Sequence, residues 1–185
     1  MKKILSLCLF CCFGAANAAT FNFEDVPDLT LVNEFYSAQG IHFTNAISLT
    51  AGFSLNEFDY PPSSGDVAIG DDFAPIEITF DNAVEDLSAY FTYGSQLTFT
   101  AFDTSGGFLG SFINLGFDNL GSSELISLSF SGIGALKIAG DIDGTFIMDD
   151  LSYSLSPTST VPAPSVLFLM LSGLISLIFA KKKEA

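Results

Sequence analysis

Histidine, arginine, tryptophan and cysteine are scarce or absent in this chain of 185 residues. It has one histidine, no tryptophan and no arginine, and its three cysteines (Cys8, Cys11 and Cys12) all lie near the start. Beyond them there is no thiolate nucleophile, no disulfide and no cysteine metal site. One histidine and no G-x-S-x-G motif leave nothing for a histidine-based metal centre or a serine hydrolase triad. We therefore expect a protein that is not an enzyme, although a pair of carboxylates for glycoside hydrolysis stays open.

Positive charge is also scarce between the two ends of the chain. Two of the six basic residues lie at positions 2–3 and three at 181–183, so Lys137 is the one between them. The same stretch holds 20 acidic residues, a formal charge of −19. Such a surface repels nucleic acid and anionic lipid and attracts divalent cations, and outside the cell carboxylate oxygens favour calcium. The alternative is a solubilising surface adapted to salty surroundings.

The N-terminus has the pattern of a secretory signal peptide. Lysines at positions 2–3 precede an apolar run over 4–13, and Ala-Asn-Ala at 16–18 forms an A-x-A cleavage site. We expect signal peptidase to cut after Ala18, with Ala19 as the second choice. The exported, mature chain then contains no cysteine.

The last 25 residues contain three parts in a fixed order. Two prolines at 162 and 164 come first, an apolar run over 166–180 follows, and lysines at 181–183 end it. In a helix this run rises roughly 22 Å at about 1.5 Å per residue, less than the roughly 30 Å hydrocarbon core of a bilayer. By the positive-inside rule the lysines stay in the cytoplasm, so the preceding chain lies outside the inner membrane.

This tail resembles the PEP-CTERM sorting signal of Gram-negative bacteria, in which an exosortase recognises a Pro-Glu-Pro motif, a short membrane span and a basic end. The matching residues are Val161, Pro162, Ala163, Pro164, Lys181, Lys182 and Lys183, with alanine where the family usually has glutamate. The resemblance implies a transient stay in the inner membrane and cleavage near Pro164. The alternative is an ordinary C-terminal membrane anchor, which a short span followed by lysines would also provide.

The stretch between the two signals is predicted to form one all-β domain, because about 140 residues suffice for a single domain with its own core. Runs rich in Phe, Ile, Leu, Thr and Tyr alternate at period two and are separated by Gly, Asp, Asn or Ser. Strands are expected at 20–24, 40–49, 76–80, 87–93, 96–103, 108–115, 124–131, 135–139 and 145–155, with a short turn or helix within 26–39. About nine strands predict an antiparallel β-sandwich of jelly-roll type. Most of the 20 phenylalanines are expected in its core.

The domain also resembles the β-sandwich domain that often precedes PEP-CTERM tails. The similarity rests on FEDVP at 23–27, GIHFTNA at 40–46, QLTFTAFDTSGGFLGSF at 96–112 and FIMDDLSYSL at 146–155. It is similar to the jelly-roll folds of carbohydrate-binding modules. That resemblance implies that the first and last strands lie near each other and can share a structural calcium.

Two pairs of acidic residues are the candidate calcium ligands in this layout. Glu24 and Asp25 close the first expected strand, and Asp149 and Asp150 lie in the last. Calcium takes six to eight oxygens, which two or three carboxylates and backbone carbonyls would supply. DIDG at 141–144 resembles the opening of a calcium loop but lacks the remaining ligands, and an Asx turn is its alternative.

An aromatic loop is the candidate sugar-binding element. EFDYPPSSGD at 57–66 has the composition of a loop and would expose Phe58 or Tyr60 to a polysaccharide, with Tyr60 as the ligand-binding candidate. The alternative is that these rings fold back onto the sheet. His42, within a strand pattern, is expected to be a partly exposed sheet residue and not a base.

The predicted organisation follows from these segments. It consists of a signal peptide (1–18), a β-sandwich domain (19–156), a Ser/Thr/Pro linker with the sorting motif (157–165), a transmembrane helix (166–180) and a basic cytoplasmic tail (181–185). We expect an exported, non-enzymatic protein of the cell surface or of an exopolysaccharide or biofilm matrix. Its expected partners are signal peptidase, an exosortase, the inner membrane and extracellular polysaccharide, but not nucleic acid. A carbohydrate-binding module or a permanently anchored envelope protein is the alternative.

Overall fold

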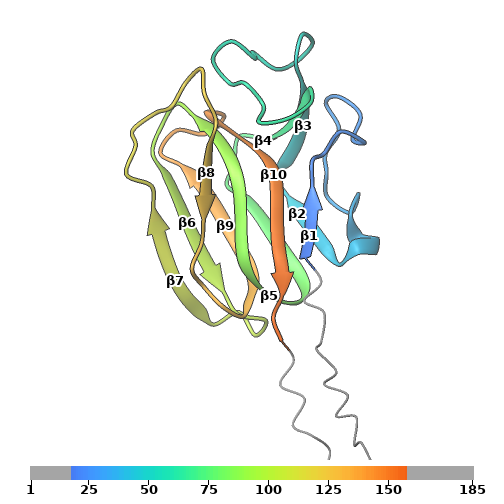
Figure 1. Ribbon diagram of the computed structural model, residues 1–185, viewed down its shortest axis with the longest axis vertical. Helices are drawn as coiled ribbons and strands as arrows, with labels where there is room; N and C mark the ends of the chain where they lie inside the picture. The colour runs from blue at the N-terminus through green and yellow to red at the C-terminus, as the bar shows by residue number, and fades with distance from the viewer. Residues whose placement is uncertain (1–17, 158–185) are drawn as a thin grey trace, which may run out of the picture.

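The computed structural model describes residues 18–157 and shows an all-β, antiparallel fold (Figure 1). Its strands are β1 (Ala18–Phe21), β2 (Ile41–Thr44), β3 (Ala46–Thr50), β4 (Val67–Asp71), β5 (Ile76–Tyr93), β6 (Leu97–Phe102), β7 (Phe108–Ile113), β8 (Glu124–Ser127), β9 (Ile133–Gly140) and β10 (Phe146–Leu155). The all-β class predicted from the alternating pattern is therefore confirmed. The sorting motif, the expected membrane helix and nearly all of the signal peptide lie outside the described residues.

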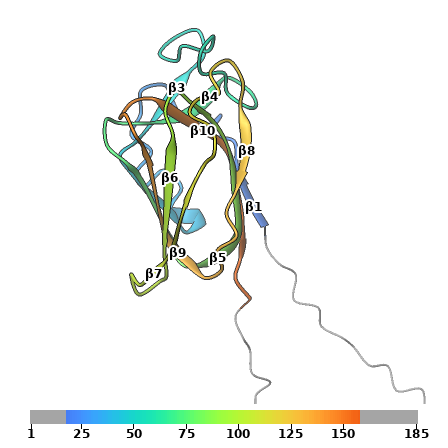
Figure 2. The same ribbon diagram turned by 90° about the vertical axis from the view of Figure 1, so that its left-hand side faces the viewer.

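Strand β5 joins the two layers of the fold. Its first part, Ile76–Phe80, pairs with β2 and β9, and its second part, Val84–Tyr93, pairs with β10 and β8, apart from one further pair of Val84 with Ile133 of β9. One layer therefore has the order β2-β5-β9-β6-β7, and the other contains β3, β4, β10, β5 and β8, with β1 beside β10. Figure 2 shows the two layers from the side, with β5 passing from one to the other at the lower end.

The bend in β5 corrects the prediction of two separate strands at 76–80 and 87–93. The polar sequence 81–86 shifts the register between Thr79 and Val84, and Asp86 has a left-handed φ of 53°. Carboxylates at these positions favour solvent over a continuous buried ladder, so the chain turns the corner there. Pairing continues on both sides of the bend, with β2 and β9 on the first part and β10 and β8 on the second.

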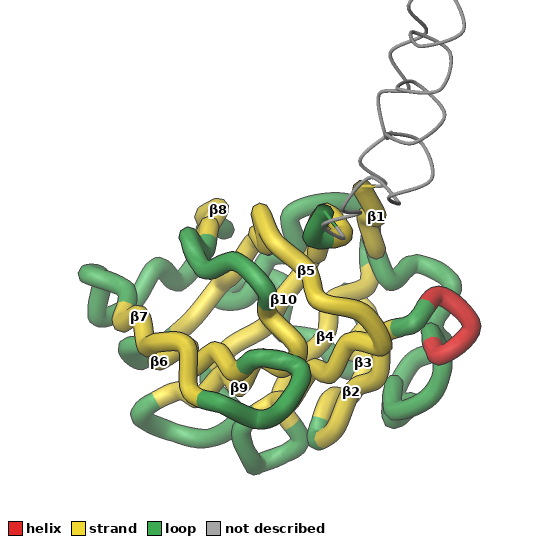
Figure 3. Tube along the Cα trace, turned by 90° about the horizontal axis from the view of Figure 1, so that it is seen from below, coloured by secondary structure: helices red, strands yellow, loops and turns green. Residues whose placement is uncertain are grey.

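Other boundaries differ in ways that trace to single residues. The strand expected over 40–49 is divided at Asn45, whose φ of 56° suits asparagine and whose side-chain amide donates to the Pro75 carbonyl at 3.1 Å. The strand expected over 124–131 ends at Ser127. The short helix expected within 26–39 is present as a 3-10 turn, η1 (Ser37–Gln39), at the edge of the fold (Figure 3).

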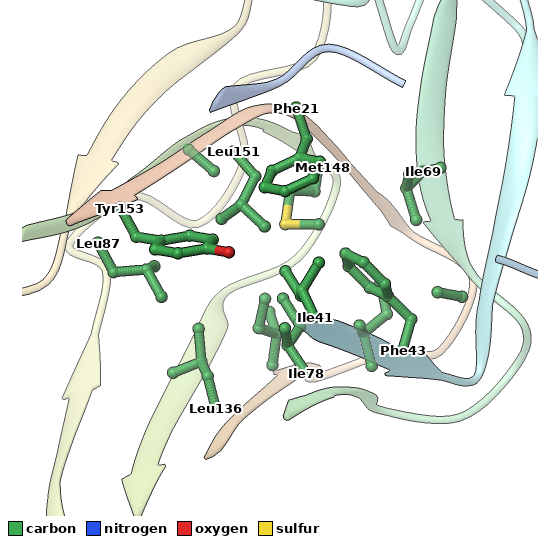
Figure 4. Close-up of a cluster of buried hydrophobic side chains, with 14 of the residues drawn as sticks. Phe21, Ile41, Phe43, Ile69, Ile78, Leu87, Leu136, Met148, Leu151 and Tyr153 are labelled. Atoms are coloured by element: carbon green, nitrogen blue, oxygen red, sulfur yellow. The ribbon is translucent and has the colours of Figure 1, made fainter. Parts of the chain in front are cut away.

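The core lies between the layers and is made of inward-facing residues from both. Figure 4 shows Phe21 of β1, Ile41 of β2, and Met148 and Tyr153 of β10 pointing toward one another. The prediction that most phenylalanines belong to this core is wrong. Within residues 18–157, seven phenylalanines are buried and seven are exposed: Phe35, Phe53, Phe58, Phe73, Phe108, Phe112 and Phe117. Alternation does not identify the exposed ones because most of them lie in the connections between strands.

The first and last strands pair directly. Ala18 to Phe21 of β1 lie opposite Ser154 to Leu151 of β10. The proximity of the first and last strands that the resemblance implied is therefore confirmed. Among residues 18–157, no helix is long and apolar enough to cross a membrane.

Candidate functional site

Five connections meet at one end of the fold, which we call the loop end (upper part of Figure 1). They are residues 51–66, 72–75, 94–96, 114–123 and 141–145. Backbone hydrogen bonds join them: Gly94 N–H donates to the Thr145 carbonyl at 2.8 Å, and Gly121 N–H donates to the Asp59 carbonyl at 2.7 Å. These bonds join 94–96 to 141–145 and 51–66 to 114–123, so the loops at this end hold one another in place.

The predicted metal ligand Glu24 holds the end of the 51–66 loop. Its Oε1 accepts the N–H groups of Asp66 at 3.0 Å and Val67 at 2.9 Å. The carboxylate lies so close to Gly65 that a Cβ there would come within 2.2 Å of Oε1. Only glycine fits this position, which also has a φ of 54°.

Asp149 and Asp150 hold the same loop from the last strand. Asp149 Oδ2 accepts the Ser64 N–H at 2.9 Å, and Asp150 Oδ1 accepts the Ser64 hydroxyl at 2.9 Å. Burial raises the pKa of the Asp149 carboxyl to about 6, against the opposing effect of the N–H bond from Ser64. Three of the four predicted ligands therefore meet at one loop, where they accept hydrogen bonds from it.

Asp25, the fourth predicted ligand, has a different contact. It accepts a hydrogen bond from the hydroxyl of Tyr36, and burial together with that bond raises the pKa of Tyr36. Within residues 18–157, no group of three acidic or histidine side chains is arranged to hold a metal ion. A structural calcium stays a prediction.

The loop 114–123 is held by Asn119, which sequence reasoning missed. Asn119 Oδ1 accepts the Tyr93 N–H at 2.7 Å, and its Nδ2 donates to the Phe91 carbonyl at 2.9 Å. Its own N–H donates to the Tyr93 carbonyl at 3.0 Å. An asparagine that satisfies the backbone of a strand end is recognisable only once the partner strand is known.

Four aromatic rings of the loop end are exposed to solvent. Phe53 is 85% exposed, Phe58 84%, Phe73 79% and Phe117 80%. A Cβ at Gly144 would lie 3.4 Å from a ring carbon of Phe73, so this ring lies close to the 141–145 turn. The exposure expected for Phe58 or Tyr60 is therefore found at Phe58.

Tyr60 folds back onto the sheet, as the alternative interpretation had it. Its ring packs against the small cluster of Leu55, Ala68 and Ile147. The hydroxyl reaches Gly94, where a Cβ would come within 2.7 Å of it. Tyr60 is therefore a wall of the site and not an exposed platform.

A cavity of about 180 Å³ lies beside Tyr60. Ser54, Asn56 and Asp71 supply its polar side chains, and Leu49, Phe146 and Ile147 supply apolar surface. Gly70 and Gly144 also line it, and their lack of side chains leaves the space open. The cavity thus combines the ring of Tyr60, the carboxylate of Asp71 and an apolar floor.

Asp71 is the one acidic residue of this cavity. It is 7% exposed, and its Oδ2 accepts the Gly144 N–H at 2.6 Å. Its Oδ1 is buried with no hydrogen-bond partner. Burial raises the pKa of the Asp71 carboxyl above its ordinary value, and the charge of nearby Asp143 raises it further. DIDG at 141–144 is thus a turn whose glycine N–H binds Asp71.

His42 lies on β2 and is 29% exposed, which agrees with the expected sheet position. Its Nδ1 is 2.6 Å from Glu34 Oε2, and its Nε2 is 3.1 Å from Asp81 Oδ1. The two carboxylates, Glu34 first, raise the pKa of His42. Both ring nitrogens are engaged by carboxylates, so the histidine has no free nitrogen to serve as a base.

Comparison with known proteins gives weak likenesses. No family model matches the chain, and no curated protein matches it. Among solved structures, a DUF4465 family protein from Bacteroides caccae is 13% identical, covers 77% of this chain and 87% of its own, and has a TM-score of 0.41. The K1 cleaved adhesin domain of Lys-gingipain from Porphyromonas gingivalis is 9% identical over 77% of this chain and 100% of its own, with a TM-score of 0.44.

A carbohydrate-binding module is also among the similar structures. A mutant of CBM29-2, from family 29 of these modules, is 11% identical over 65% of this chain and 99% of its own, with a TM-score of 0.33. At these identities and TM-scores, function has to be argued from the residues of this chain.

Proposed function

We propose that this chain is an exported, non-enzymatic surface protein that binds extracellular polysaccharide through its loop end. The observation that carries the proposal is that the loop end presents both exposed rings, those of Phe58, Phe73 and Phe117, and carboxylates. The loops that carry them are held together by hydrogen bonds. Rings of this kind stack on the apolar faces of sugars, and carboxylates accept hydrogen bonds from sugar hydroxyls. Loop conformations fixed before binding reduce the entropy lost on association.

Binding without catalysis is the function that this surface supports best. Within the described residues, the polar groups of the loop end are carboxylates, amides and hydroxyls, and the histidine of the chain lies on β2 between two carboxylates. The pairing of the first and last strands in a two-layer fold supports the jelly-roll type that we expect for a binding module. The matrix of an exopolysaccharide or biofilm is the setting in which such a module would act.

The destination of the protein is proposed from its two ends. The signal peptide and the Pro162-Ala163-Pro164 tail support export, transient anchoring in the inner membrane and processing by an exosortase. Mass spectrometry of the C-terminus of the protein recovered from its native cell tests this. A C-terminus near Pro164 supports sorting, whereas a chain that ends at Ala185 in the membrane fraction identifies a permanent anchor.

Binding is tested by affinity electrophoresis of the full chain in gels that contain neutral or charged polysaccharides. We expect retardation by at least one polysaccharide and loss of that retardation in Phe58→Ala combined with Phe73→Ala. Phe108→Ala is the matched control, because Phe108 is 67% exposed but begins β7, away from the loop end. Equal loss in the control, or no retardation by any polysaccharide, would contradict the proposal.

A further inference from the structure

The side chain of Asp71 is incompletely satisfied in a way that points to a ligand. It ends β4, is 7% exposed and lines the cavity beside Tyr60. Its Oδ2 binds the Gly144 N–H, but its Oδ1 has no partner. Buried polar acceptors nearly always find a hydrogen-bond donor, because an acceptor without a partner loses its hydration and gains nothing in return, at a greater cost when it is charged. A donor brought by a ligand would complete this carboxylate.

The size of the cavity limits what that ligand can be. Its volume is about 180 Å³, whereas sites for drug-sized ligands occupy about 300–1,000 Å³. At roughly 30 Å³ for each water, this is the space of about six water molecules, which suits a single sugar ring or a short chain. Leu49 and Ile147 offer apolar surface to the carbon–hydrogen face of such a ring, and Asn56 offers an amide.

The charge around the cavity selects the kind of donor. Asp143 lies close enough to raise the pKa of Asp71, and both Asp59 and Asp71 raise the pKa of Tyr60. The one lysine of the domain, Lys137, is on β9 and pairs with Glu77 at 3.4 Å, so it does not neutralise this region. A negative cavity with an aromatic wall favours a cation, which gains from the carboxylate and from the face of the ring.

We propose that this cavity binds a primary ammonium group carried by an amino-sugar residue, with the Asp71 carboxylate pairing with it and Tyr60 forming the wall beside it. This inference rests on the proposed polysaccharide binding and names the chemical class of the sugar. The exposed rings Phe58 and Phe73 hold neighbouring sugars of the polymer, and the cavity selects for the free amine. An N-acetylated sugar has no positive charge and is therefore the discriminating comparison.

The test is calorimetric titration of the full chain with a glucosamine oligomer, with an N-acetylglucosamine oligomer of the same length, and with n-butylammonium. We expect the glucosamine oligomer to bind at least about tenfold more tightly than the other two, an effect of the size that one charged hydrogen bond provides. Asp71→Asn should remove this preference. Asp72→Asn, which makes the same charge change at an exposed neighbour, should keep it.

If Asp71→Asn does not fold, the preference of the wild-type protein for the glucosamine oligomer over the other two ligands tests the proposal on its own. Equal affinity for the two oligomers overturns the ammonium site, as does an equal effect of Asp71→Asn and Asp72→Asn. Equal binding of n-butylammonium overturns the amino-sugar assignment. If a neutral polysaccharide still depends on Phe58, the proposed function stands without the ammonium site. If no sugar polymer binds, the proposed function itself fails.

Discussion

Burial of the Asp149 carboxyl makes the stability of the protein depend on pH. Asp149 is 1% exposed, and its pKa is raised from 3.8 to about 6. Between these two values the folded protein binds the proton more tightly than the unfolded chain does. The unfolding free energy should therefore fall as pH rises through this window, by about 3 kcal/mol at most. Urea unfolding at about pH 4 and pH 7 measures the fall.

The control for this effect is Asp149→Asn, which keeps the shape of the side chain and cannot ionise. The fall between the two pH values should be smaller in the variant than in the wild type. An identical fall in both proteins would show that the carboxyl of Asp149 is not its source.

His42 produces a pH dependence at higher values. Its hydrogen bonds to Glu34 and Asp81 raise its pKa above the ordinary 6.5, so the folded state favours the protonated ring. This contribution is fully present below the unfolded pKa and is lost as pH rises through the raised one. His42→Gln should lower the melting temperature more at about pH 5.5 than at about pH 9. A difference that does not change with pH would contradict the ion pairs.

Single residues were the hardest level to predict from the sequence. The aromatic loop and the partly exposed His42 follow from local composition. Which ring of the loop faces solvent does not, because it depends on the cluster of Leu55, Ala68 and Ile147 that receives Tyr60. Asp71 was missed because its burial arises from the 141–145 turn, which is 70 residues further along the chain.

At the scale of elements, Asn119 is expected to control the order of the 114–123 loop. Asn119→Ala removes two side-chain hydrogen bonds to β5 and leaves the Tyr93 N–H without that partner. We expect a loss of about 1–3 kcal/mol, expressed mainly as faster hydrogen exchange in the loop. Hydrogen exchange measured by mass spectrometry reports both the loop and the core.

The control is Asn22→Ala, at an exposed position directly after β1. Asn114, within the loop, is buried and cannot serve as the control. Protection of 114–123 should be unchanged in this control. Equal protection of the loop in Asn119→Ala and the wild type would show that the loop does not depend on Asn119.

The positions of the strands are largely predictable from the sequence, but the bends and breaks within them are not. Period-two alternation locates most of β6 and β10, because their inward residues must be apolar and their outward ones need not be. The corner of β5 and the division at Asn45 depend instead on which neighbours are available for pairing. That information is tertiary, so a local pattern cannot contain it.

At the scale of the whole molecule, stability depends on the large negative charge. With a formal −19 on the stretch between the two ends, like charges repel one another in the folded state. Raising sodium chloride from about 10 to 150 mM shortens the Debye length from about 30 to 8 Å and should raise the melting temperature. An unchanged or lower melting temperature would contradict this. The predicted calcium site requires a further rise with calcium chloride at matched ionic strength.

The fold class and the expected export and sorting are predicted from patterns that span many residues. Alternation over most of the domain predicts an all-β fold, and the order of charged and apolar parts at each end predicts export and sorting. The meeting of five connections at the loop end was not predictable. It depends on strand order, which places residues such as Asp59 and Gly121 in contact.

The most direct test of sugar binding at the loop end is an NMR titration, in which a fragment of a polysaccharide that retards the protein is added to the isotope-labelled protein. The account predicts that the largest shifts of backbone amide signals fall within 54–60, 71–73, 119–121 and 141–145. Shifts concentrated around Lys137 and Glu77 on β9 and β5, or no shifts in the loop end at saturating fragment, would contradict it.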